Sequence, residues 1–208
     1  MDENIVYSRE VIEFTAVANE YCHFLEEASS ADGLNLLLVL QKLLPLLYTK
    51  ALNLPEIDSK LEEDVEKFVR EEDWQLIRDN LSLKFGEAND YIDVNQDKES
   101  TEELIYGDLS ENLADIYQDI KDFLMVYRMG TVELMNDALW ECRETFRMFW
   151  GHKLVNTIRA VHFALIDKEK IGGNITGDMS GKDKSDWILS RRQEEFRKEN
   201  EDDEEDDF

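Results

Sequence analysis

Proline and glycine are scarce in this sequence: two prolines and nine glycines occur among 208 residues. These residues interrupt helices and build tight turns, so their scarcity favours long helices over many short strands. Hydrophobic residues make up 42% of the chain and aromatic residues 10%, which supplies a core and excludes a disordered acidic protein. We therefore predict an all-α fold, a helical bundle of about five to seven helices.

Cysteine is also rare, and Cys22 and Cys142 are its two occurrences. Both lie in helix-like patterns and no CxxC spacing joins them, so we expect two buried free thiols, as in a reducing compartment. The first four residues, MDEN, lack the basic and apolar regions of a signal peptide. These features together predict a cytoplasmic protein.

Basic residues are few, because 23 Lys and Arg stand against 49 Asp and Glu and the net charge is −26. Phosphate backbones and anionic membranes attract Lys and Arg, so the charge disfavours direct nucleic-acid binding and membrane binding. The charge is consistent with a basic protein surface as the partner, with a divalent cation as the ligand, or with a role in solubility alone.

One long hydrophobic run is present, with ten leucines between Leu34 and Leu52. A membrane span needs about 20 consecutive apolar residues, and Lys42 interrupts this run. We therefore predict the buried central helix of the bundle here. Pro45 has no amide proton and should kink that helix.

Apolar residues recur at intervals of three and four over most of the remaining chain, which predicts further helices. The patterns predict helices over residues 8–28, 108–129 and 131–167, and two short helices within 59–85. The last pattern changes phase at Gly151, which indicates a kink there or burial of the helix on two sides.

Composition divides the chain into three parts. We predict residues 1–167 to be a single all-helical domain, with an irregular middle loop without a sheet between 85 and 101, where turn residues dominate. Residues 168–193 are rich in Gly, Lys, Asp and Ser and are predicted to be a linker that can hold a short amphipathic helix. Residues 194–208 hold ten acids and two bases, which predicts a disordered acidic tail.

One stripe of the predicted helix 108–129 is acidic, because at about 100° per residue five carboxylates fall together. They are Asp108, Glu111, Asp115, Asp119 and Asp122. The stripe could meet a basic partner or bind a divalent cation, since Mg²⁺ and Ca²⁺ take oxygen ligands. The alternatives are a solvated helix face and pairing with an Arg of another helix.

Four polar residues gather near one side of the predicted helix 131–167. They are His152, Asn156, Arg159 and His162. They could line a polar cleft, which requires His152 and Arg159 to converge in an open pocket. The alternative is a hydrogen-bond network between helices, in which Arg159 pairs with Asp115 or Asp119.

Four segments carry a family resemblance: residues 106–119 (YGDLSENLADIYQD), 138–142 (ALWEC), 150–156 (WGHKLVN) and 158–162 (IRAVH). Over about residues 10–165 the chain resembles a bacterial all-helical family, domain of unknown function 5063. The resemblance implies an all-helical cytoplasmic protein. It brings no activity and no catalytic residues with it.

No GxGxxG, Walker loop, HExxH or GxSxG motif occurs. A single ExxH at residues 20–23 stands where a di-iron bundle needs two, so we predict no cofactor and no bound metal. The composition favours an uncharacterised, non-enzymatic interaction module that presents an acidic surface to a basic partner. The alternative is an enzyme or ligand-binding protein with a polar cleft, able to use a divalent metal, between helices 108–129 and 131–167.

Overall fold

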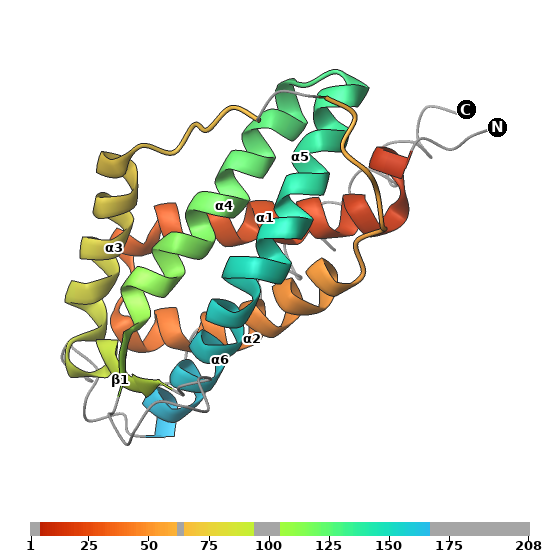
Figure 1. Cartoon of the computed structure of the whole chain (residues 1–208). Coiled ribbons are helices and arrows are strands. Elements are labelled where there is room, and N and C mark those ends of the chain that lie inside the picture. The colour runs from red at the N-terminus through yellow and green to blue at the C-terminus, as the bar shows by residue number, and fades with distance from the viewer. Residues whose placement is uncertain (1–4, 62–64, 94–104, 167–208) are drawn as a thin grey trace, which may run out of the picture. The chain divides into compact units, whose positions relative to one another are not determined.

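A computed structural model describes residues 5–61, 65–93 and 105–166, all within one unit of the chain, Met1–Gly173. Within these residues the chain forms six α-helices, one π-helical turn, three 3₁₀ turns and a two-stranded antiparallel sheet (Figure 1). The helices are α1 (Arg9–Glu26), α2 (Gly33–Leu52), α3 (Glu71–Phe85), α4 (Leu109–Met129), α5 (Val132–Thr145) and α6 (Gly151–Ile166). The all-α prediction is confirmed. The predicted linker 168–193 and acidic tail 194–208 lie outside the described residues.

Helix α4 is the central element, because it packs against α1, α3, α5 and α6. Figure 1 shows α4 running beside α5, with α1 crossing behind them. The apolar side chains of α4 that repeat at helical spacing, including Leu113, Ile116 and Ile120, are fully buried. Because α4 has neighbours on several sides, some of its polar side chains face other parts of the protein. Several of its carboxylates therefore contact other groups of the protein.

Helix α2 is therefore not the centre of the bundle, which corrects the prediction for the leucine run. It packs against α1, α3 and α6, and its outer residues Leu46 and Leu52 are 37% and 59% exposed. By length and composition α2 could cross a membrane, but helices in the cores of soluble proteins meet the same criterion. Pro45 lies inside the helix, where the hydroxyl of Thr49 donates a hydrogen bond to its carbonyl at 2.8 Å.

An extended segment, residues 54–61 and 65–70, connects α2 to α3 without regular secondary structure. Two short helices were predicted within 59–85; in the part of this range that the structure describes, the second forms, as α3, and the first does not. Figure 1 shows the segment passing α5 and α4 on its way to α3. Its backbone amides are held by side chains of those two helices, as described below, and this replaces the hydrogen bonds of the missing helix.

The predicted helix 131–167 is divided by a π-helical turn, η4 (Phe146–Trp150), between α5 and α6. The amide of Gly151 donates to the carbonyl of Phe146, five residues earlier. A Cβ at Gly151 would lie 2.3 Å from that carbonyl oxygen, so the turn requires glycine here. The change of phase in the sequence thus reflects an extra residue in one turn.

A small sheet forms where an irregular loop without strands was predicted. Strand β1 (Asp90–Asp93) pairs antiparallel with β2 (Ile105–Asp108), and Tyr91 lies opposite Gly107. The ring of Tyr91 covers Gly107 so closely that a Cβ there would lie 2.4 Å from the ring. The Tyr91 hydroxyl accepts a hydrogen bond from Asn112 at 2.5 Å. One glycine and one tyrosine therefore dock the strands against α4.

Candidate functional site

The amino-terminal end of the acidic stripe serves the helix itself. Asp108 is the N-cap of α4, and its carboxylate accepts hydrogen bonds from the amide of Glu111 at 2.8 Å and the hydroxyl of Ser110 at 2.7 Å. An acidic N-cap accepts hydrogen bonds from free backbone amides, and its negative charge interacts favourably with the positive end of the helix dipole. Glu111 is exposed and lies in the first turn of α4, where its charge has the same effect.

The middle of the stripe is bonded to two other helices. Asp115 accepts a hydrogen bond from the indole nitrogen of Trp74, in α3, at 2.8 Å, and pairs with the ammonium group of Lys153, in α6. The predicted interhelical pairing of Asp115 therefore exists, with Lys153 in place of Arg159. This carboxylate ties α3 and α6 to α4.

The last two carboxylates lie beneath the extended segment. Asp122 is 3% exposed, and one of its oxygens accepts hydrogen bonds from the amides of Phe68 and Val69 at 2.7 and 2.9 Å. Asp119 lies beside it, close to Lys67 and Glu141. Burial raises the pKa of Asp119 to about 6; Lys67 lowers it, and the carboxylates of Asp122 and Glu141 raise it further.

Asp119, Asp122, Lys67 and Glu141 line a cavity of about 10 Å³ between α4, α5 and the extended segment. That volume holds about one water molecule. Lys67 pairs with Glu141 at 2.7 Å. Among the residues that the structure describes, no three His, Cys, Asp or Glu side chains are placed to hold a metal ion. The five carboxylates of the stripe thus do not form one exposed surface: Asp108 caps a helix, Asp115 joins helices and Asp122 holds the extended segment.

The predicted polar residues of the last helix separate into two places. Arg159 turns toward β1, where it donates to the carbonyl of Ile92 at 2.6 Å and pairs with Asp93 at 3.7 Å. Its guanidinium also lies 6.0 Å from the centre of the Tyr91 ring. Arg159 lines a cavity of about 450 Å³ together with Glu87, Asp90 and Phe163 among others.

His152 and Asn156 line a different cavity, so His152 and Arg159 do not converge in one pocket. This second cavity, here called the hollow, has a volume of about 440 Å³. Its lining comes from α2, the π turn and α6: Tyr48, Phe146, Arg147, Gly151, His152, Val155 and Asn156. His162 is exposed and lies edge-on to the ring of Phe163. The hollow is between α2 and α6, whereas the predicted cleft was between helices 108–129 and 131–167.

Sequence reasoning missed the polar residues of α5 that hold the extended segment. Asp137 is 2% exposed and accepts hydrogen bonds from the amides of Lys60 and Leu61 at 2.6 and 2.9 Å. Asn136, equally buried, donates to the carbonyl of Asp58 at 2.8 Å. The available signal was their position between Met135 and Ala138 on the apolar side of the helix.

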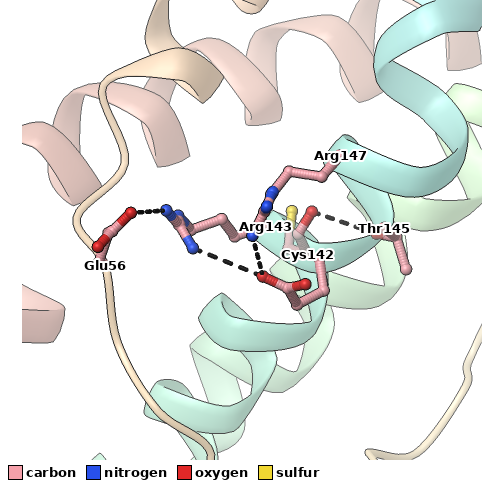
Figure 2. A network of polar contacts seen from close by, with 6 residues as sticks. Glu56, Cys142, Arg143, Thr145 and Arg147 are labelled. Carbon is pink, nitrogen blue, oxygen red and sulfur yellow. Dashed lines mark hydrogen bonds and ion pairs between the residues drawn. The ribbon is translucent and has the colours of Figure 1, made fainter.

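A further network joins the end of α5 to the extended segment. The guanidinium of Arg143 contacts Glu56 at 3.0 Å and Glu144 at 3.5 Å, and Glu144 is also 3.3 Å from Arg147. Figure 2 shows Glu56, Arg143 and Arg147 in this network, with the carbonyl of Cys142 bonded to the Thr145 hydroxyl.

Both thiols are buried and free, as predicted. Burial raises the pKa of Cys22 and of Cys142 well above the ordinary thiol range. A thiol held in its neutral form is a poor nucleophile, so neither cysteine has the character of a catalytic residue.

Comparison with known proteins places the chain in a family. The model of a family described as Domain of unknown function (DUF5063) matches residues 5–167. Protein BF1032 from Bacteroides fragilis, whose crystal structure is solved, is 40% identical; the match covers 83% of this chain and 99% of that chain, with a TM-score of 0.70. No curated protein matches. Because the family model matches most of the sequence, the chain belongs to the DUF5063 family.

Proposed function

We propose that the protein is a non-enzymatic interaction module whose acidic edge, residues 56–73, contacts a basic partner protein. Nine of its residues are Asp or Glu and three are Lys or Arg. The observation that supports this proposal is the exposure of its carboxylates. Exposed carboxylates of the edge include Asp58, Glu66, Glu71, Glu72 and Asp73.

The acidic edge differs from the acidic stripe in what its side chains do. Carboxylates of the stripe such as Asp115 and Asp122 are occupied by groups of the protein itself. On the edge, four backbone amides bond inward to Asp122 and Asp137, while the carboxylates of the described residues, such as Glu66 and Glu72, are exposed. Lys67, one of its three bases, is paired with Glu141.

Charge complementarity of this kind selects partners by sign and accelerates their association. The same sign argument opposes direct nucleic-acid binding and binding to anionic membranes. We propose the cytoplasm as the compartment, since two buried free thiols are compatible with reducing conditions.

The alternative function, an enzyme or ligand-binding protein with a polar cleft between α4 and the α5–α6 helices, has less support. The cavity between α4 and α5 has a volume of about 10 Å³, which is too small for an organic substrate. His152 and Arg159, the residues expected to converge there, line different cavities.

The test is affinity capture with the full-length protein in an extract of the organism that encodes it. One variant neutralises four acids of the edge: Asp58→Asn, Glu66→Gln, Glu71→Gln and Glu72→Gln. A control variant neutralises four exposed acids elsewhere and has the same net charge: Glu10→Gln, Glu27→Gln, Glu87→Gln and Glu111→Gln.

We expect wild type and control to retain the same basic protein, and the edge variant to lose it. Raising the salt concentration should weaken the capture, because exposed charges are screened over about 10 Å at 0.1 M salt. If wild type enriches nothing over the bare matrix, or if the edge variant retains the partner as well as the control does, the proposal is wrong.

A further inference from the structure

The hollow between α2 and the π turn has the size of a small-molecule site. Its volume of about 440 Å³ lies within the range of about 300–1,000 Å³ that is usual for ligand pockets. It is formed by side chains on helices, which position groups more rigidly than loops do.

One wall of the hollow is aromatic. The rings of Tyr48 and Phe146 are 5.5 Å apart, and Phe146 in turn packs on Trp150 at 4.6 Å. Trp150 is fully buried, and its indole nitrogen donates to the carbonyl of Cys142 and the hydroxyl of Thr145, both at 3.2 Å. The tryptophan therefore fixes Phe146, which is 7% exposed and contributes to the lining of the hollow.

Among the residues that the structure describes, the polar lining of the hollow consists of basic and neutral groups and holds no carboxylate. Arg147, His152, Asn156 and the hydroxyl of Tyr48 supply it, although acids outnumber bases about two to one in the whole chain. Within the described part of the chain, the side chains of His152 and Asn156 and the Tyr48 hydroxyl make no hydrogen bond. These groups are thus available to a ligand.

Arg147 has N–H donors that its contact with Glu144 does not use. It is 61% exposed and contacts Glu144 at 3.3 Å through one terminal nitrogen. Glu144 is shared with Arg143, which is 17% exposed and also pairs with Glu56 (Figure 2). Because a guanidinium carries five N–H donors, Arg147 can bind a further anion without leaving Glu144.

The two basic groups of the hollow, Arg147 and His152, lie within and just after the π turn. In an α-helix, residues five apart point in different directions, since a turn takes 3.6 residues. In a π turn, residues five apart are hydrogen-bonded neighbours, as Phe146 and Gly151 are. Arg147 and His152 have the same spacing and line the same hollow. Turns of this kind occur often at functional sites.

We propose that the hollow binds a small aromatic carboxylate, with its ring against Tyr48 and Phe146 and its carboxylate toward Arg147 and His152. Arginine recognises carboxylates through two parallel hydrogen bonds, and Asn156 supplies a further donor. This site is independent of the acidic edge, and either proposal can fail without the other.

The test is a titration of the isotope-labelled full chain, followed by protein NMR, with four probes used separately. Benzoate and 4-hydroxybenzoate carry the proposed chemistry, benzamide is the neutral counterpart of benzoate, and inorganic phosphate is an anion without a ring. We expect saturable shifts of the amides of residues 146–156 with the two carboxylates. Benzamide and phosphate should bind at least about tenfold more weakly, which corresponds to about 1.4 kcal/mol.

Three variants complete the test, each checked for folding by circular dichroism. Arg147→Gln and His152→Ala should each weaken benzoate binding about tenfold. The matched control is Arg128→Gln, which removes an exposed arginine from the end of α4 and should leave the affinity unchanged. No saturable binding of the carboxylates, equal binding of benzamide or phosphate, or an equal effect of Arg128→Gln would each overturn the proposal.

Discussion

Asp119 should destabilise the folded protein at neutral pH, and its replacement by asparagine should be stabilising. The pKa of its carboxyl rises from 3.8 to about 6, chiefly through burial. One pKa unit corresponds to about 1.4 kcal/mol, so keeping this group ionised in the folded state at neutral pH costs about 3 kcal/mol. Asparagine has the same shape without the charge, and Lys67 keeps its partner Glu141 at 2.7 Å.

The sign of the pH dependence follows from linkage. Between pH 3.8 and about 6 the folded state binds more protons at Asp119 than the unfolded state does, so this group's contribution to stability falls as the pH rises. Asp119→Asn removes that loss. The gain in unfolding free energy should therefore be about 3 kcal/mol at about pH 7.5 and about half of that at about pH 5.

The assay is urea denaturation of wild type and Asp119→Asn at both pH values, followed by circular dichroism. Glu111→Gln is the control, because Glu111 lies on the same helix and is exposed. It should change stability by no more than about 0.5 kcal/mol at either pH. A variant that is less stable than wild type, or a gain that does not grow with pH, would show that Asp119 is not a strained buried carboxylate.

Three further stability changes follow from single contacts and can be measured by the same denaturation. Asp122→Ala should cost about 3–5 kcal/mol, since two buried amides lose a charged acceptor, and hydrogen exchange at Phe68 should accelerate; unchanged exchange would contradict the contact. Gly151→Ala should cost about 1–3 kcal/mol through overlap with a carbonyl, whereas Val155→Ala, on the exposed side of the same helix, should cost less. Tyr21→Phe should cost about 1–2 kcal/mol, because the buried hydroxyl donates to the carbonyl of Leu113 at 2.8 Å.

Helical periodicity predicted most of the fold because it reports burial along one element. The predicted helix 108–129 differs from α4 (Leu109–Met129) only by its N-cap, Asp108. Periodicity also grouped the carboxylates of α4 into a stripe. It could not show what faces that stripe, because Trp74, Lys153 and the amides of the extended segment come from distant parts of the chain.

The π turn is a second feature that the sequence pattern indicated without showing its structural cause. The shift of the apolar pattern at Gly151 is visible in the sequence and was interpreted as a kink or as burial on two sides. A π turn produces the same shift, and the hydrogen bond from Gly151 to Phe146 distinguishes it. Consequently the sequence indicated His152 and Asn156 as site candidates but gave no signal for Tyr48, which reaches the hollow from another helix.

The described residues 59–61 and 65–70 form no helix, and the reason is found by comparing how a helix and an extended segment would satisfy the same polar groups. Residues 59–62 (SKLE) have the S-x-x-E spacing of a capping box. Such a cap stabilises a helix by about 1 kcal/mol, and a helix would satisfy its own amides. It would also leave Asp122 and Asp137 buried without partners, which costs several kcal/mol for each charge. In the extended form four amides, two for each carboxylate, bind these charges. A hydrogen bond to a charged group contributes about 1.5–3 kcal/mol. The four hydrogen bonds to the two carboxylates therefore stabilise the extended form by more than the cap at Ser59 would stabilise a helix.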